Sequence, residues 1–112
     1  MQTTIKHIVT SFVNLRRTQG LTQEYVRDNW HVDVSNIENG RNYPGLTNYL
    51  KLCKGYQISG GWLLILSEMV DDQQLSIDEM EYIVDNWDQF DEYAHFLSDG
   101  FTRITKAKFY KK

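Results

Sequence analysis

The chain has few of the residues and segments that form disulfides, membrane-crossing helices or metal sites. Its 112 residues contain one cysteine, Cys53, which excludes a disulfide within the chain. No apolar run approaches the roughly 18 residues that a membrane-crossing helix needs. The first residues show no basic segment followed by an apolar one, so we expect a protein of the cytoplasm. The three histidines are scattered and show no metal-ligand spacing with Cys53, so we expect no metal site.

Signatures of catalysis are also missing. The chain contains no glycine-rich phosphate loop and no nucleophile elbow, and its length suits one small domain with an appendage. Acidic pairs at 71–72, 78–79 and 91–92 lack the spacing of a calcium-binding loop, and we interpret them as solvated helix surface. We therefore expect neither an enzyme nor a cofactor.

Charge is strongly segregated along the chain. Residues 1–66 carry seven Lys and Arg against four Asp and Glu, whereas residues 67–99 carry eleven acidic residues and no Lys or Arg. Residues 100–112 carry five basic residues and no acidic one. The net charge of -3 thus conceals a mildly basic head, an acidic arm and a basic tail. Hydrophobic residues make up 41% of the chain, which is enough for a packed core and excludes a disordered protein.

Apolar residues recur at helical spacing through the first seventy residues, which predicts five short helices. Gly20 is positioned to end the first helix, and Thr22 and Ser59 are suited to cap the second and the fifth. A Pro-Gly pair at 44–45 marks a loop before the fourth. On this fourth helix one apolar face is expected from Leu46, Tyr49, Leu50 and Cys53.

The acidic arm has the clearest local signal. Ser76 and Glu79 have the spacing of a capping box, and an apolar stripe follows from Ile77 to Leu97. This pattern predicts one helix of about 20 residues, roughly 30 Å long, with an acidic outer face. The expected fold class is therefore all-α, with one domain over 1–70 and an appendage over 71–112.

Several motifs follow one another in a characteristic order. They are Leu15-Arg16, Gly20-Leu21-Thr22-Gln23-Glu24, Glu38-x-Gly40-x-x-x-Pro44 and Ile58-Ser59-Gly60-Gly61-Trp62-Leu63-Leu64. Together they resemble the Xre family, the Cro and CI type of helix-turn-helix regulator. The resemblance covers a little under half of the chain and implies a five-helix Cro/CI repressor-like bundle that binds double-stranded DNA.

The resemblance also implies roles for individual residues. Arg16 and Glu38 match positions that form a structural ion pair between the first helix and the end of the third. Gln23 stands at the start of the second helix, where an amide can join backbone N–H groups in gripping a phosphate; the alternative is a plain helix-start residue. The recognition helix is expected within residues 31–39.

If Val34 and Ile37 pack inward, this segment exposes polar side chains that can contact bases. They are Asp33, Ser35, Asn36 and Asn39. The residues expected to hold phosphates are Arg41 and Asn42, with Arg17, Arg27 and Lys6 as weaker candidates.

The chain departs from the family between the second and third helices. Glu38 lies seventeen positions after Leu21, whereas the family usually has about twenty, so almost one helical turn is missing. Either the second or the third helix is shortened, or the turn is rebuilt around Trp30. The glycine usual in this turn falls near His31.

Two functions remain open at this stage. The first is a transcriptional regulator that binds operator DNA as a homodimer, because symmetric dimers read two half-sites one helical turn apart. The expected dimer or partner surface consists of Trp62, Ile65, Met69, Ile83, Trp87 and Phe90. The alternative is a protein-binding modulator or antitoxin that keeps the helix-turn-helix fold and docks a basic protein through its acidic arm.

Overall fold

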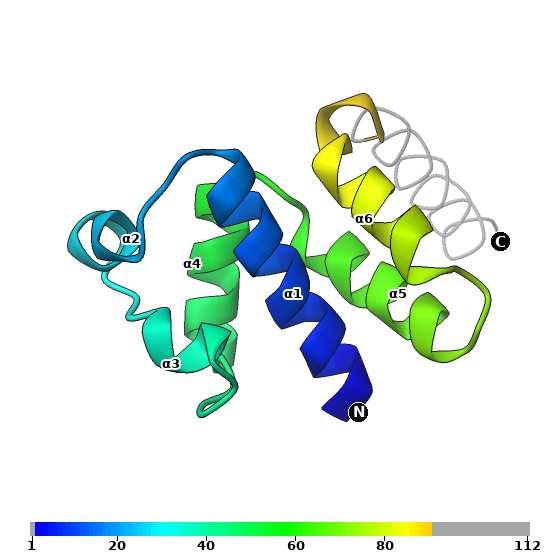
Figure 1. Cartoon of the computed structure of the whole chain (residues 1–112), viewed down its shortest axis with the longest axis horizontal. Helices are drawn as coiled ribbons and strands as arrows, with labels where there is room; N and C mark the ends of the chain where they lie inside the picture. Colours follow the sequence, from blue (N-terminus) through cyan, green and yellow to red (C-terminus); the bar gives the residue numbers. More distant parts are fainter. Residues whose placement is uncertain (1, 91–112) are drawn as a thin grey trace, which may run out of the picture.

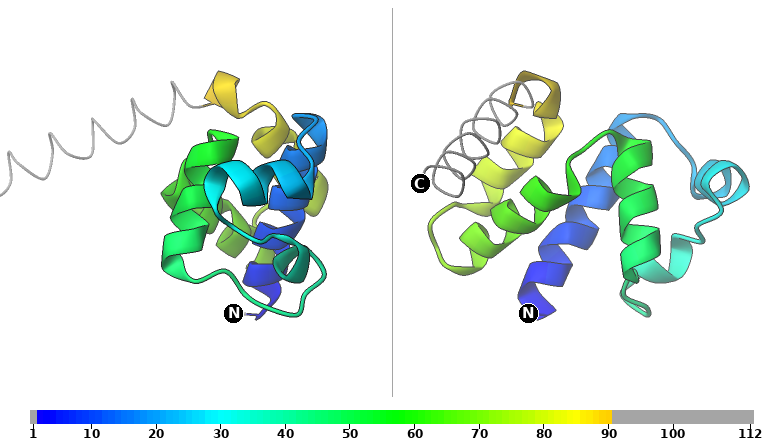
Figure 2. Two further views of the ribbon diagram at one scale, coloured as in Figure 1. Left: turned by 90° about the vertical axis from the view of Figure 1, so that its left-hand side faces the viewer. Right: turned by 180° about the vertical axis from the view of Figure 1, so that it is seen from behind.

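The computed structural model describes residues 2–90 of the chain, and within them it is entirely helical. In chain order the helices are α1 (Gln2–Thr18), α2 (Gln23–Trp30), α3 (Ser35–Glu38), α4 (Leu46–Tyr56), α5 (Gly60–Asp71) and α6 (Ile77–Asp85), as Figure 1 shows. The views in Figure 2 place α2 and α3 at one end of the molecule and α5 and α6 at the other. The helices α1 and α4 lie between these ends.

Helix α1 is the element around which the others pack, because it contacts α3, α4, α5 and α6. Its residues Ile8, Phe12 and Leu15 recur at helical spacing and are buried. The ring of Phe12 lies between two tyrosines of α4, with ring centroids 5.8 Å from Tyr49 and 5.7 Å from Tyr56. These contacts hold α1 and α4 together in the middle of the bundle.

Side-chain caps begin three of the helices. The hydroxyl of Thr22 accepts a hydrogen bond from Tyr25 N at the start of α2, and that of Ser59 accepts one from Trp62 N at the start of α5. At the start of α6, Ser76 and Glu79 form the complete capping box. All three caps confirm the helix starts predicted from the sequence.

Helices α2 and α3 are both short. Helix α2 has eight residues and α3 has four, so the recognition helix expected within 31–39 is a single turn. His31 ends α2 with a left-handed backbone (φ 58°), near the position where the sequence resemblance implies a glycine. Residues 31–34 then alternate between exposed and buried, with Val32 and Val34 in the core, and this non-helical link takes up the first part of the expected recognition helix.

Trp30, the last residue of α2, anchors the start of this link to α4. Its ring stands edge-on to Tyr56, with centroids 4.9 Å apart. It also lies against the backbone of Gly55, where an added Cβ would be 2.6 Å from a ring carbon of Trp30. The close approach requires glycine at this position.

The acidic helix expected over residues 77–97 is interrupted. Helix α6 ends at Asp85, Asn86 forms a turn, and helical backbone begins again at Trp87. The side-chain amide of Asn86 donates to the carbonyl of Tyr82, which competes with the continuing helix for backbone acceptors. Residues 91–97 of the expected stripe, like the basic tail, lie outside the described residues.

The described part of the acidic arm packs into the same hydrophobic core as the helices of residues 1–66. Met80, Val84 and Trp87 are buried, and α6 packs against α1 and α5. Trp87, which we had assigned to a dimer or partner surface, is only 7% exposed. That assignment is wrong for Trp87, because its ring is already covered by the chain's own helices.

Candidate nucleic-acid interface

The predicted ion pair between Arg16 and Glu38 is present and joins α1 to α3. Arg16 donates through Nε to Oε2 at 2.7 Å and through Nη2 to Oε1 at 2.9 Å. Its third nitrogen donates to the carbonyl of Leu21 at 2.9 Å. One guanidinium therefore holds α1, the link before α2 and the end of α3 in a fixed arrangement.

The electrostatics of this pair favour the charged form of both partners. Burial of the Glu38 carboxyl disfavours its charged form, but hydrogen bonds from Arg16 and Gln23 outweigh this and lower its pKa. The hydrogen bond to Glu38 likewise raises the pKa of Arg16. Both side chains are mostly buried, so the pair is a structural element and not a free charge for a ligand.

Gln23 belongs to the same network. Its side-chain amide donates to Oε1 of Glu38 at 3.0 Å, which orients the side chain along α3 at the start of α2. Gln23 is exposed and lies one residue after the Thr22 cap. It is thus held at the helix N-terminus, where the partial positive charge of α2 favours an anion.

A hollow of about 320 Å³ lies where α1, α2 and α3 meet. Its lining residues are Val13, Arg17, Gln23, Ser35, Glu38 and Asn39. Four of these were predicted to contact DNA, namely Arg17, Gln23, Ser35 and Asn39. The fold therefore brings predicted residues from three helices to one place on the surface.

A second hollow of about 300 Å³ continues this one along α1. It is lined by Ile5, Lys6, Val9, Thr10, Ile37, Glu38, Asn39, Gly40 and Tyr43. The two hollows share Glu38 and Asn39 in their linings, and both lie between α1 on one side and α3 with its following turn on the other. We call the union of these residues the α1–α3 groove.

The turn after α3 is held by hydrogen bonds around Asn39. The backbone N–H groups of Arg41 and Asn42 both donate to the carbonyl of Asn36, and Arg41 N also donates to Oδ1 of Asn39 at 3.0 Å. Gly40 has a left-handed backbone (φ 82°), which lets the chain reverse here. Arg41 and Asn42, predicted to hold phosphates, are exposed on this ordered turn.

Two predicted base readers are engaged with each other. Oδ1 of Asp33 accepts hydrogen bonds from the backbone N–H of Ser35 at 3.2 Å and from its hydroxyl at 2.7 Å. The bonds from the Ser35 hydroxyl and backbone lower the pKa of Asp33. Asp33 therefore closes a local turn just before α3, and the Ser35 hydroxyl proton is already donated to it.

Among the described residues, Arg27 is the one predicted DNA-binding cation whose charge is balanced by neighbouring acidic side chains. Its guanidinium lies 3.2 Å from Asp28 and 3.8 Å from Glu24, both on α2. It does not line the α1–α3 groove. The two carboxylates weaken the attraction of Arg27 for phosphate. Arg27 therefore differs from Arg17 and Arg41 both in its electrostatic surroundings and in its position outside the groove.

The expected dimer surface divides into exposed and covered residues. Ile65 is 45% exposed, whereas Trp62, Ile83 and Phe90 are partly buried against the core. Met69 is partly buried as well. The sequence missed three more exposed leucines: Leu46 and Leu50 on α4, and Leu64 on α5. Helical spacing had placed Leu46 and Leu50 on the buried face of α4, but only Tyr49 and Cys53 of that face are buried.

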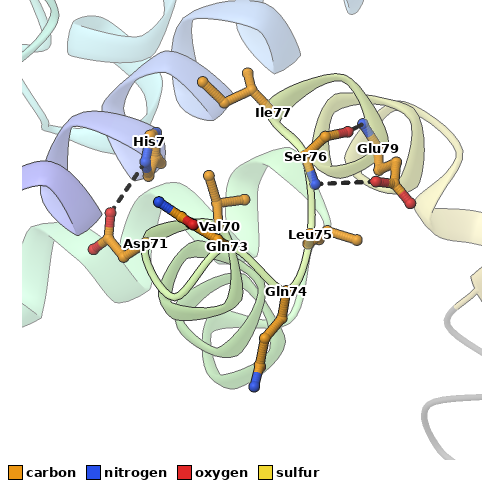
Figure 3. A pocket seen from close by; sticks show the side chains of 9 residues that line it. All are labelled: His7, Val70, Asp71, Gln73, Gln74, Leu75, Ser76, Ile77 and Glu79. Carbon is orange, nitrogen blue, oxygen red and sulfur yellow. Dashed lines mark hydrogen bonds and ion pairs between the residues drawn. The ribbon is translucent and has the colours of Figure 1, made fainter.

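A further hollow, of about 540 Å³, lies where α1, the end of α5 and the start of α6 meet and is shown in Figure 3. His7 on α1 lies 3.2 Å from Asp71 on α5, and the Ser76–Glu79 capping box forms part of the rim. Asp71 also accepts a hydrogen bond from Thr4. These contacts join α1 to α5, and the carboxylates of Asp71 and Glu79 make the hollow unfavourable for an anion.

The described residues thus define an all-helical protein with a polar, locally cationic groove beside a one-turn helix. No family model, no curated protein and no solved structure matches this chain. Within residues 2–90 no helix is long and apolar enough to cross a membrane. The same residues contain no group of three His, Cys, Asp or Glu side chains able to hold a metal ion.

Proposed function

We propose that this chain is a DNA-binding regulator of the Xre type that binds duplex DNA as a homodimer. The observation that carries the proposal is the α1–α3 groove, which gathers Arg17, Gln23 and Asn39 on one surface fixed by the Arg16–Glu38 pair. The order of α1 to α5 and the capped starts of α2 and α5 support the same proposal.

The charges at this surface suit a polyanion. Among the described residues, Lys6, Arg17 and Arg41 form no ion pair with an acidic side chain. Glu38, the acidic residue in the groove, is neutralised by Arg16. DNA phosphates would replace water around three cations without displacing an existing partner.

Gln23 and the turn at Arg41 would hold the DNA backbone on either side of α3. Gln23 adds its amide to the positive end of α2, and Arg41 and Asn42 present a guanidinium and an amide from an ordered turn. Asn36 and Asn39 are the remaining polar side chains of the α3 region, and Oδ1 of Asn39 already accepts from Arg41 N. Base reading by α3 would then contribute less than contacts to the DNA backbone.

A second copy of the chain would cover the apolar face shared by α4 and α5. Leu50 Cδ2 lies 3.7 Å from the position of a Cβ at Gly60, and Leu64 follows Gly60 by one helical turn. Leu46, Leu50, Leu64 and Ile65 are 43–73% exposed. An apolar face of this kind favours association, and a two-fold axis through it would pair two DNA-binding surfaces.

Fluorescence anisotropy with a labelled random-sequence duplex of about 25 base pairs, long enough for two half-sites, tests the proposal. Binding is expected at about 50 mM salt and should weaken steeply by about 200 mM. The Arg41→Ala variant should bind more weakly to every sequence by a similar factor. A wild-type chain that leaves the anisotropy unchanged at the lowest salt would contradict DNA binding.

The acidic surface supports a second candidate function, the docking of a basic protein. Helix α6 exposes Asp78, Glu79 and Asp85, and Asp72 lies exposed just before it. A one-turn α3 with its Ser35 hydroxyl engaged also weakens base-specific DNA recognition. Purification of the chain from its native cells with a stoichiometric basic protein, lost on Asp78→Lys together with Asp85→Lys, would favour this candidate.

A further inference from the structure

Helix α1 presents a solvent-facing stripe that runs the full length of the α1–α3 groove. The stripe consists of Lys6, Thr10, Val13 and Arg17, which recur at intervals of four, three and four residues and so share one helix face. All four line the groove, and Lys6, Thr10 and Arg17 are exposed. At 1.5 Å per residue, the eleven residues from Lys6 to Arg17 span about 16 Å.

Charge along this stripe has one sign. A cation stands at each end, and the stripe itself contains no acidic residue. Across the groove, Glu38 is bonded to Arg16 and Gln23, and the exposed Arg41 lies between two lining residues, Gly40 and Tyr43. An extended polyanion with regularly spaced charges is complementary to this arrangement, whereas the acidic surface of α6 is complementary to a basic protein.

Helix α3, in contrast, offers little for reading bases. It is one turn long, the Ser35 hydroxyl donates to Asp33, and the side-chain Oδ1 of Asn39 accepts from Arg41 N. Sequence is read through side chains that reach base edges, whereas contacts to phosphates carry no sequence information. The described residues therefore provide more for the DNA backbone than for base edges.

We infer that the stripe on α1 is a backbone-tracking surface for duplex DNA, with Lys6 and Arg17 contacting phosphates at the two ends of the groove. This inference rests on the proposed function and deepens it. Phosphate contacts then supply most of the binding, and discrimination between DNA sequences is small. The tightest duplex selected from a randomised pool should bind less than about 10³-fold better than the unselected pool.

The salt dependence of binding tests the role of each cation. The full chain and its Lys6→Gln, Arg17→Gln and Lys54→Gln variants are titrated against two duplexes of equal length and unrelated sequence. Each phosphate contact contributes about 0.9 to the slope of log K against log salt. Lys6→Gln and Arg17→Gln should each lower the slope by about this amount on both duplexes. Lys54, exposed near the end of α4 and outside the groove, is the matched control and should leave the slope unchanged.

A second pair of variants adds a charge instead of removing one. Thr10→Asp places a carboxylate in the middle of the stripe, and Thr47→Asp places one on the exposed surface of α4. Thr10→Asp should weaken binding at least as much as Lys6→Gln, while Thr47→Asp should stay close to wild type. Far-ultraviolet circular dichroism checks that every variant keeps its helices.

The outcomes separate the two proposals. Absence of wild-type binding at low salt would overturn the proposed function and this inference together. Wild-type binding with unchanged slopes for Lys6→Gln and Arg17→Gln would overturn the inference alone. The same conclusion would follow if the Lys54→Gln slope fell equally, or if one selected sequence bound more than about 10³-fold better than the pool.

Discussion

Arg16 on α1 and Glu38 at the end of α3 are joined by two charge-assisted hydrogen bonds of 2.7 and 2.9 Å. The pair connects the central helix of the bundle to a helix of only four residues, which is too short to be stable by itself. The position of α3, and with it the shape of the α1–α3 groove, therefore depends on this contact. Gln23 adds a third member to the network and couples the start of α2 to the same carboxylate.

Replacing Glu38 by Gln should lower the free energy of unfolding by about 1–3 kcal/mol, because it leaves the mostly buried guanidinium of Arg16 without its counter-charge. Urea denaturation followed by circular dichroism measures the change. Glu24→Gln is the control, since the Glu24 side chain is 76% exposed and should change stability by less than about 0.5 kcal/mol. Equal effects of the two substitutions would contradict a structural role for the pair.

Stability should fall in acid, and Glu38 should account for part of the loss. Its pKa in the folded protein lies below the ordinary value of 4.5, so the folded state favours its charged form. The resulting stabilisation is complete above the unfolded pKa and is lost as the pH falls through the lower, folded pKa. Urea midpoints measured from about pH 6 down to pH 3 should therefore decline less steeply for Glu38→Gln than for the wild type. Parallel curves would show that Glu38 does not contribute.

Gly55→Ala should destabilise the protein, because the new methyl group would lie 2.6 Å from a ring carbon of Trp30. The ring cannot move away easily, since it is packed edge-on against both Tyr25 and Tyr56. We expect a loss of about 1–3 kcal/mol in thermal or urea unfolding, the usual cost of overpacking. Gly61→Ala is the control, because the nearest atom to its new methyl group is 4.0 Å away. A Gly55→Ala protein as stable as the control would show that Trp30 does not fix the link before α3.

Dimerisation should depend on the apolar face of α4 and α5. Leu50→Glu places a charge on that face and should shift the protein to a monomer at concentrations where the wild type is a dimer. Size-exclusion chromatography with light scattering measures the mass directly. Ile77→Glu is a matched control, because Ile77 on α6 is 52% exposed and Leu50 is 53% exposed. A wild-type monomer at all concentrations, or loss of the dimer in the control alone, would contradict this surface.

Local signals in the chain were sufficient for much of the fold. A capping residue and its partner are at most three positions apart, so Thr22, Ser59 and Ser76 marked their helix starts without knowledge of the rest of the molecule. The inward positions of Val34 and Ile37 were also correct, because a single turn is enough to orient them. The Arg16–Glu38 pair was predicted only through the resemblance, since 22 positions separate the two residues.

Other features depended on packing between distant segments. Leu46 and Leu50 have the helical spacing of a buried face, yet no other described helix covers them, so they are exposed. The long acidic helix was expected from an uninterrupted apolar stripe, but Asn86 forms a turn and Trp87 is buried in the core. The Asp33–Ser35 bonds could not be anticipated once residues 31–39 were assumed to be helical.

The sequence by itself therefore determined the helical class, the capped helix starts and the segregation of charge, because these follow from neighbouring residues. Tertiary structure alone decided the course of the chain between α2 and α3. Val32 and Val34 are packed into the core from the link after α2, which leaves α3 a single turn. The tertiary structure also decided that Lys6 and Arg17, eleven residues apart on α1, line the same groove as Asn39. A groove between two helices exists only after they pack, so its charge could not be read from either helix separately.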